Sequence, residues 1–172
     1  MPLVYALLTR KTSDQYVKVL QAMKAAVDEY HVPVYMPTRF MSDFEKGIHN
    51  ACAEVYPNVN IKCCFFHLGQ SLYRRIQETG LQVQYRDEND RRIKNYTHIL
   101  LAVAFVPVDD VPTAFNLLRG TWREDDFKPV LDYFGKTYVH GVPAKGRRRA
   151  VAPRYSPASI MPQLLRRTAP TT

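Results

Sequence analysis

The first half of the chain alternates between short apolar runs and longer segments in which apolar residues recur every three or four positions. A short apolar run predicts a strand and a three-to-four residue period predicts a helix. The predicted strands span residues 3–8, 39–42 and 59–65, and the predicted helices span residues 12–30, 43–56 and 68–79. The run at residues 3–8 is apolar enough to be buried on both faces. Strands alternating with helices predict an α/β layer in which helices pack on a sheet.

The second half of the chain shows helical periodicity without strand-like runs. One predicted helix ends before Pro107, a second begins at Pro112, and a third covers residues 127–134 and ends at Gly135. Proline at a helix start and glycine just past a helix end are the usual boundary signals. The expected fold class is therefore α/β with a helical C-terminal half.

Positive charge is concentrated at the C-terminal end of the chain. The net charge is +8, and residues 136–172 hold eight basic residues, no acidic residue and five of the twelve prolines. A basic, proline-rich segment of this kind indicates an extended tail that favours a polyanion such as nucleic acid, or one that only aids solubility.

Other classes of protein are not favoured by the composition. No apolar run reaches the length of about 18 residues that a membrane span requires, and the N-terminal segment lacks the features of a signal peptide. Three cysteines, two of them adjacent, fit a reduced intracellular protein better than a disulfide framework. We therefore expect an intracellular protein with no membrane partner.

Asp43 is the first candidate for chemistry. It follows the predicted strand at residues 39–42, and active sites of α/β sheets gather at the carboxyl ends of strands. A carboxylate there suits metal coordination. The alternative is structural, because Ser42 and Glu45 have the spacing of a capping box and Asp43 would then favour only the helix dipole.

Four side chains have the donor types of a zinc site. They form a His-x2-Cys pair and a Cys-x2-His pair, namely His49, Cys52, Cys64 and His67. The alternative is that the cysteines serve packing, because Cys52 falls on the apolar face of its predicted helix. Zinc is thus a possible but less favoured cofactor.

Two groups of basic residues are candidates for nucleic-acid binding. Arg74 and Arg75 follow the segment CCFFH and would face a phosphate backbone or only solvent. The tail contributes a second group, Lys145, Arg147, Arg148 and Arg149.

Several of these segments occur together and in one order. LVYALLTRKTSDQYVKVLQAM is followed by FMSDFEKGIHNACAEVYPNVNIKCCFFHLGQSLYRRIQETGL, and then by LLAVAFVPVDDVPTAFNLLR and VLDYFGKTYV. This order resembles the Mutator-like element (MULE) transposases over about residues 2–140. The S-D-F-E and C-x-x-H steps, each leading from a strand into a helix, carry the resemblance at this separation.

The resemblance implies a ribonuclease H-like core with a short mixed sheet flanked by helices. Such transposases hold two divalent metals, normally Mg²⁺ or else Mn²⁺, on an Asp, Asp, Glu (DDE) triad for DNA cleavage and strand transfer. Asp43 matches the second catalytic Asp, a metal ligand. Cys64 and His67 match the family's C-x-x-H motif, which we expect to support the site or to engage DNA.

The other two acids of the triad are not identified in this sequence. The family's first Asp lies on a strand before the segment matching residues 3–8, and its Glu lies beyond the helical insertion. We therefore expect residues 1–135 to form a catalytic-core-like domain truncated at the N-terminus and at the C-terminus, and residues 136–172 to form an extended or disordered tail. The expected function is that of a fragment or degenerate transposase, inactive as this chain, nuclear and DNA-binding. The alternative is a non-catalytic module that binds DNA or protein, with zinc in support.

Overall fold

The computed structural model describes residues 4–29, 37–122 and 125–160. The α-helices are α1 (Ser13–Glu29), α2 (Lys46–Val55), α3 (Phe65–Glu78), α4 (Gln82–Arg86), α5 (Arg92–Ala102), α6 (Val111–Thr121), α7 (Lys128–Phe134) and α8 (Pro157–Ile160). The strands are β1 (Arg39–Ser42) and β2 (Asn60–Cys63). The chain forms two compact units, Met1–Lys62 and Cys63–Thr172. Each unit is described separately.

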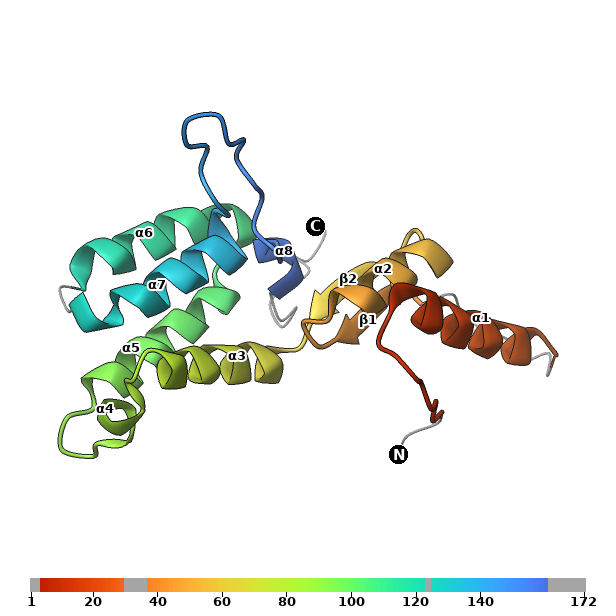
Figure 1. The fold of residues 1–172 in the computed structure, drawn as a ribbon, viewed down its shortest axis with the longest axis horizontal. Coiled ribbons are helices and arrows are strands. Elements are labelled where there is room, and N and C mark those ends of the chain that lie inside the picture. Colours follow the sequence, from red (N-terminus) through yellow and green to blue (C-terminus); the bar gives the residue numbers. More distant parts are fainter. Residues whose placement is uncertain (1–3, 30–36, 123–124, 161–172) are drawn as a thin grey trace, which may run out of the picture. The chain divides into compact units, whose positions relative to one another are not determined.

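The first unit is a pair of helices beside a small sheet (Figure 1). Helix α1 packs on α2, and β1 pairs with β2 in a two-stranded parallel sheet. The buried core consists of Val17 and Leu20 from α1 with Ala51 and Cys52 from α2. Because these residues recur at helical spacing, each helix presents one apolar face to the other. The pairing of the strands begins where the Asn60 N–H donates to the Thr38 carbonyl at 3.0 Å.

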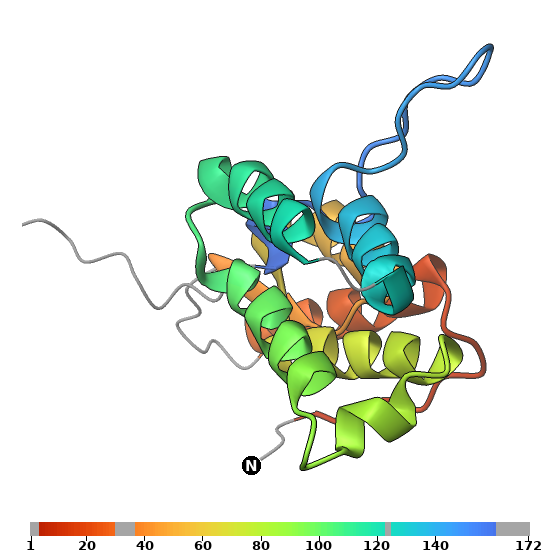
Figure 2. The ribbon, with the colours of Figure 1, turned by 90° about the vertical axis from the view of Figure 1, so that its left-hand side faces the viewer.

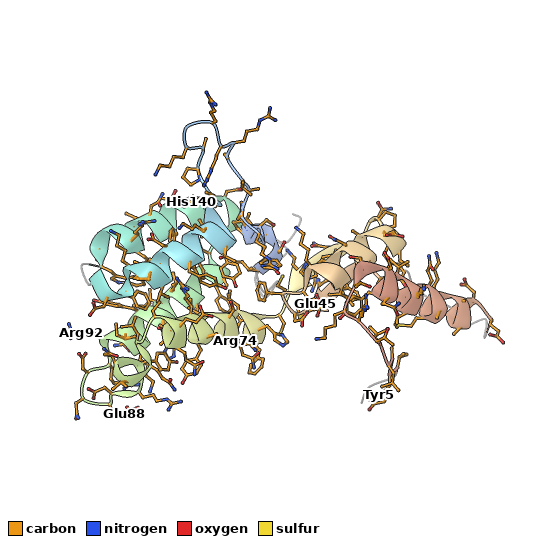
Figure 3. All side chains as sticks on the ribbon, viewed as in Figure 1. Tyr5, Glu45, Arg74, Glu88, Arg92 and His140 are labelled. Carbon is orange, nitrogen blue, oxygen red and sulfur yellow. The ribbon has the colours of Figure 1, made fainter. Side chains whose placement is uncertain are left out.

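The predicted strand at residues 3–8 is wrong for residues 4–8, which form no strand. Their apolar side chains are exposed, with Tyr5 at 84% and Leu7 at 104% of full exposure, and Figure 3 shows Tyr5 away from the helices of this unit. A buried central strand needs a hydrogen-bonded neighbour on each side. Among the described residues the sheet contains only β1 and β2, so this segment has no strand to pair with. Leu3 lies outside the described residues.

Two boundaries in the first half of the chain also differ from the prediction. Strand β1 spans Arg39–Ser42 as expected, but α2 begins at Lys46 and not at residue 43. Strand β2 ends at Cys63, so Phe65 is the first residue of α3 and not part of a strand. The apolar alternation from Val59 to Phe65 predicted one buried face, but at its last position Phe65 is exposed in the first turn of α3, so the pattern outran the strand.

The second unit is helical. Leu68, Leu72 and Ile76 of α3 are fully buried, as their spacing predicted. The helix ends where the N–H of Leu81 donates to the Ile76 carbonyl at 2.9 Å and that of Gly80 to the Gln77 carbonyl at 3.1 Å. This pair of bonds is a Schellman motif, and it confirms the predicted stop at Gly80. Figure 2 shows α3, α5, α6 and α7 gathered in one bundle, with α4 next to α5.

The predicted helices of the second half are present, with one addition. Helix α5 ends before Pro107 and α6 contains Pro112 in its first turn, as expected. Helix α7 ends at Phe134 with Gly135 as its C-cap, as expected, but the chain continues from there as a π-helical turn, Gly135–Val139. A side chain at residue 135 would contact the ring of Phe115 at 3.0 Å, so glycine here also allows close packing.

The described part of the predicted tail has secondary structure. Residues 142–151 form a hairpin, in which Val142 pairs with Val151 and Lys145 with Arg148, and α8 follows. Both Figure 1 and Figure 2 show this hairpin projecting away from the helices of the second unit. Tyr138, Tyr155 and Ile160 are buried. The predicted domain limit at residue 135 stays a prediction, and residues 161–172 lie outside the described part.

The structure thus shows a mixed α/β protein that is mostly helical, with a small two-stranded parallel sheet. The broad fold class is as predicted. The sheet is parallel rather than mixed, and the ribonuclease H-like core stays an expectation.

Candidate functional site

Asp43 lies in the loop between β1 and α2, at the carboxyl end of β1, and is half-buried. The loop is fastened by His49 on the second turn of α2. The His49 Nε2 lies 2.9 Å from the Asp43 carbonyl oxygen and 2.8 Å from the Ser42 Oγ, and the Ser42 hydroxyl donates to the Asp43 carbonyl at 3.1 Å. These hydrogen bonds engage the backbone carbonyl of Asp43, and its carboxylate takes part in none of them.

The predicted capping box of Ser42 and Glu45 is wrong. Glu45 is itself the N-cap residue of α2 and makes no side-chain cap hydrogen bond. Its carboxylate instead accepts a hydrogen bond from the Tyr16 hydroxyl at 2.8 Å and lies 3.6 Å from Lys11 Nζ. These contacts join the start of α2 to α1 and to the segment just before it, and they replace the local cap that the spacing suggested.

The pKa of Tyr16 responds to its burial and to the two carboxylates beside it. Burial raises the pKa of Tyr16 to about 12, with further contributions from its hydrogen bond to Glu45 and from the charges of Glu45 and Asp43. Each of these effects disfavours the phenolate. Two carboxylates therefore act on one neutral hydroxyl in the first unit.

A two-metal centre of the family's kind needs more oxygen ligands than this loop gathers. Asp43 supplies one carboxylate, and the nearest acid along the chain, Glu45, is engaged by Tyr16 and Lys11. Across residues 4–29, 37–122 and 125–160, no three His, Cys, Asp or Glu residues come together where they could hold a metal ion. The described residues therefore do not fit a pair of Mg²⁺ ions.

The four predicted zinc ligands are divided between the two units. His49 and Cys52 lie on α2 in the first unit, and Cys64 and His67 lie in the second. Cys52 is fully buried in the apolar core, and burial raises the pKa of its thiol, which disfavours the thiolate that zinc binds. His49 bonds the loop of Asp43. The zinc site stays a prediction, and these two placements do not favour it.

The C-x-x-H motif lies at the start of α3. Cys64 is the N-cap residue, half-buried and without a side-chain cap hydrogen bond, and His67 lies in the first turn. The Nδ1 of His67 is buried and, within the described residues, has no hydrogen-bond partner. The ring of Phe66 contacts the His67 imidazole edge-on, with centroids 5.7 Å apart. Because a buried unpaired ring nitrogen is uncommon, His67 is the side chain of this motif that the structure leaves least satisfied.

The predicted nucleic-acid contacts differ in their surroundings. Arg74 is exposed on α3 (Figure 3), whereas the Arg75 guanidinium stacks on the Tyr133 ring, 5.6 Å from its centroid. The hairpin cations Lys145, Arg147, Arg148 and Arg149 are all exposed. Arg74 thus points to solvent, whereas Arg75 packs against α7.

Sequence reasoning missed the residues that surround Arg75. Tyr133, Tyr138 and Ser71 form a cluster of hydroxyls, in which Ser71 Oγ lies 2.6 Å from the Tyr133 hydroxyl and 2.8 Å from that of Tyr138. Burial raises the pKa of Tyr138 above its usual range. Lys128 and Lys136 lie nearby on α7 and the π-turn. The helical spacing of residues 129, 132, 133 and 136 places them on one face of a helix. It does not tell that this face packs against α3, where Arg75 lies.

Comparison with known families identifies the first part of the chain. Residues 1–71 match the family model of the MULE transposase domain, so the predicted resemblance is confirmed over this segment. The match includes β1, Asp43, α2, β2 and the C-x-x-H motif. No curated protein matches the chain, and no solved structure does. Within the described residues, no helix is long and apolar enough to cross a membrane.

Proposed function

We propose that this chain has a transposase-related function in which it binds DNA, and that the protein acts in the nucleus. The single observation that carries the proposal is the match of residues 1–71 to the MULE transposase domain. Transposases of this kind act on DNA, and the second unit has the charge to bind it. Residues 63–172 hold 17 basic and ten acidic residues, against seven and six in residues 1–62.

DNA cleavage and strand transfer are the activity that the family implies, and they require metals on several carboxylates. In this chain Asp43 occupies the position of one such ligand, on a loop held by His49. The described residues bring no second and third acid to it. The proposal is therefore that the chain is a degenerate or partial transposase whose DNA binding is retained and whose strand transfer is not.

Fluorescence anisotropy with a 30-base-pair duplex is the test of DNA binding. We expect binding that weakens steeply between about 50 and 200 mM salt, because released counterions drive a backbone-dominated interaction. A chain that fails to bind DNA even at the lowest salt would overturn the proposal.

Calorimetry with Mg²⁺ or Mn²⁺ is the test of the incomplete site. Wild type and Asp43→Ala are expected to show the same absence of micromolar binding. Asn50→Ala, an exposed change on α2, is the matched control. Micromolar binding that only Asp43→Ala removes would mean that a further carboxylate completes the site, and strand transfer would then have to be assayed.

A second candidate is a non-catalytic DNA-binding module derived from a transposase. The exposed hairpin with its four cations favours it, because this surface needs no contribution from Asp43. Micromolar binding of Mg²⁺ or Mn²⁺ that Asp43→Ala removes would exclude this non-catalytic module.

A further inference from the structure

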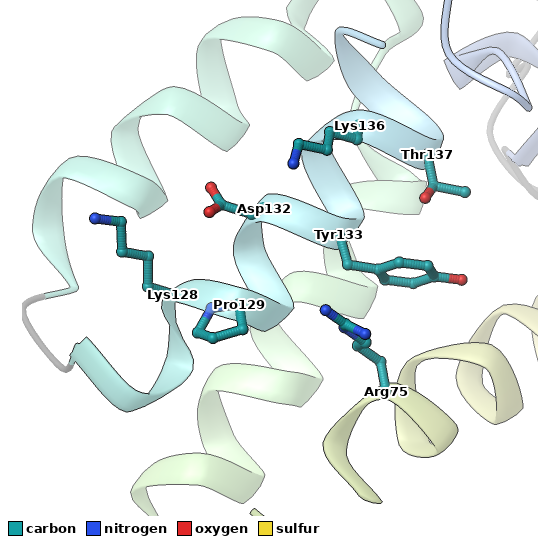
Figure 4. A pocket seen from close by; sticks show the side chains of 7 residues that line it. All are labelled: Arg75, Lys128, Pro129, Asp132, Tyr133, Lys136 and Thr137. Carbon is teal, nitrogen blue, oxygen red and sulfur yellow. The ribbon is translucent and has the colours of Figure 1, made fainter. Parts of the chain in front are cut away.

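A pocket of about 440 Å³ lies within the second unit, between α3 and α7 (Figure 4). Its polar lining comes from Arg75 on α3, from Lys128, Asp132 and Tyr133 on α7, and from Lys136 and Thr137 on the π-turn. Figure 4 shows Arg75 reaching from α3 toward Tyr133 and Pro129 on the facing helix. The pocket is therefore made by two packed helices and not by a loop.

The charge of this pocket suits an anion. Three cations line it against one carboxylate, and that carboxylate is already bound, because Arg119 of α6 donates to Asp132 at 2.6 Å. Neither Lys128 nor Lys136 has an acidic partner among the described residues, and both are exposed. An anion in the pocket would meet the positive charge of the two lysines, which have no acidic partner there, and that of Arg75, which is shared with Glu78.

The side chain of Arg75 is held in place by its contacts with Tyr133 and Glu78. Its guanidinium lies over the Tyr133 ring, and the Tyr133 hydroxyl is fixed in turn by Ser71 at 2.6 Å. One terminal nitrogen donates to Glu78 at 3.0 Å, but the Nε is buried and has no partner in the described part of the chain. Because this Nε is buried, a phosphate in the pocket would instead meet the terminal nitrogens of the planar guanidinium, whose geometry suits phosphate oxygens.

A second pocket, of about 460 Å³, connects this site to the hairpin. It shares Asp132 and Lys136 with the first pocket and extends to Val142 and Ala150 at the base of the hairpin. The hairpin returns at Gly146, whose φ of 59° suits the two-residue turns that join antiparallel strands. Its base closes at Gly141, where any side chain would meet the Val151 carbonyl oxygen at 2.0 Å. The two pockets thus lead from Arg75 past Lys136 to the base of the hairpin, and the exposed cations of the hairpin lie beyond it.

We propose that the pocket between α3 and α7 seats a backbone phosphate of a DNA strand that continues past Lys136 to the hairpin. Arg75, Lys128 and Lys136 contact phosphate and confer no sequence preference, since phosphate contacts position a protein on DNA without reading bases. The inference rests on the proposed DNA-binding function and adds the site and the path to it.

The test compares the double variant Lys128→Gln, Lys136→Gln with Arg91→Gln, Lys94→Gln in the full chain. Both remove two charges from the second unit, but the second pair lies beside Glu88, outside the pocket. Anisotropy with the 30-base-pair duplex is measured between about 50 and 200 mM salt. The pocket variant is expected to lose about tenfold in affinity near 0.1 M salt, and its salt slope is expected to fall by about two. The control is expected to bind within about twofold of wild type.

Acetylation of lysines, read by mass spectrometry, supplies a second measurement. DNA is expected to protect Lys128 and Lys136 and to leave Lys94 reactive. Equal affinity and slope for the pocket variant, with Lys128 and Lys136 unprotected, would overturn the pocket while leaving DNA binding intact. Binding of inorganic phosphate that the pocket variant loses, without any change in DNA affinity, would also overturn it and leave a free-anion site. A wild-type chain that binds no DNA would overturn both this inference and the proposed function.

Discussion

The two units of this protein differ in what holds their polar residues in place. In the first unit Asp43 lies on a loop whose backbone is gripped by His49, and its charge balance is nearly even. In the second unit the cations lie on packed helices and on a hairpin, with an excess of seven positive charges over residues 63–172. The first unit lies within the family match, whereas the second carries the excess of positive charge on which the proposed DNA binding rests.

The two steps from strand to helix show the same difference on a smaller scale. Three residues separate β1 from α2, and the side chain of the last, Glu45, accepts a hydrogen bond from Tyr16 of α1, whereas Cys64 alone separates β2 from α3. The three-residue connection places Asp43 outside the hydrogen-bonded turns of α2. The single-residue connection places the C-x-x-H motif at the start of α3, so helix geometry alone sets its position.

The largest expected effect tests whether the two units are independent. Phe134 is fully buried and packs against Phe115 and Tyr138, with ring centroids 5.8 and 5.2 Å away. Phe134→Ala is expected to cost the second unit about 3–5 kcal/mol of unfolding free energy, through lost burial and the cavity that remains. Hydrogen exchange is the measurement. Amides of α3, α5 and α7 should lose protection, while those of α1 and α2 keep theirs.

Leu20→Ala in the core of the first unit is the reciprocal change. It is expected to lower protection in α1 and α2 and to leave α7 unaffected. If either substitution lowers protection equally in both units, the chain unfolds as one cooperative body and the comparison fails.

The next effect concerns the charge difference between the units. Replacing Arg147, Arg148 and Arg149 with Gln is expected to raise the Kd for duplex DNA about 100-fold near 0.1 M salt, or about 2.7 kcal/mol, because three phosphate contacts are lost. The melting temperature should not change, since these side chains are exposed. The matched control replaces Lys18, Lys24 and Lys46, three exposed lysines of the first unit. Equal losses in both variants would mean that total charge and not the hairpin governs binding.

The sequence predicted the helices better than the strands. The core positions of α3 have a strict three-to-four residue spacing, and the Gly80 stop has a local hydrogen-bond signature, so both were predictable. Residues 4–8 have the composition of a buried strand, but a strand depends on partners elsewhere in the chain, and local pattern carries no information about them. The prediction failed at residues 4–8 for that reason.

The candidate site shows the same limit. The position of Asp43 after a strand was predictable, because β1 is marked by its own residues. The contacts of Glu45 with Tyr16 and of Arg75 with Tyr133 join residues 29 and 58 positions apart, and no local spacing reports such pairs. The capping box was a reasonable reading of Ser42 and Glu45, but tertiary bonds replaced it.

A smaller effect concerns Tyr16 and the carboxylates around it. Because the pKa of Tyr16 is raised to about 12, chiefly by burial, the folded state keeps the phenol neutral above the pH near 10 at which an unfolded tyrosine ionises. This stabilisation is complete below about pH 10 and is lost as the pH rises to about 12. Tyr16→Phe is expected to cost about 1 kcal/mol at neutral pH, through the lost bond to Glu45.

The measurement is urea unfolding of wild type and Tyr16→Phe between pH 8 and 12. The stability of the wild type should fall relative to that of the variant as the pH rises above about 10, because only the wild type has a phenol at residue 16 to ionise. Tyr138 and Tyr155, whose pKa values are also raised by burial, are present in both proteins and cancel. Parallel curves would show that Tyr16 titrates as in the unfolded chain.

The smallest expected effect separates the observed loop from the capping box that the spacing suggested. In the structure Ser42 Oγ lies 2.8 Å from His49 Nε2, and Glu45 bonds Tyr16 instead of the backbone N–H of Ser42. A double-mutant cycle of Ser42→Ala with His49→Asn is therefore expected to show a coupling energy of about 0.5–1 kcal/mol. The cycle of Ser42→Ala with Glu45→Gln should show none within the error of measurement. A capping box would give the opposite result, with coupling between Ser42 and Glu45 and none between Ser42 and His49, because Ser42 and Glu45 would then cap the same helix start together. Coupling to His49 alone would show that the His49 side chain fixes the loop of Asp43. The position of Asp43 would then depend on this contact and not on a cap at the start of α2.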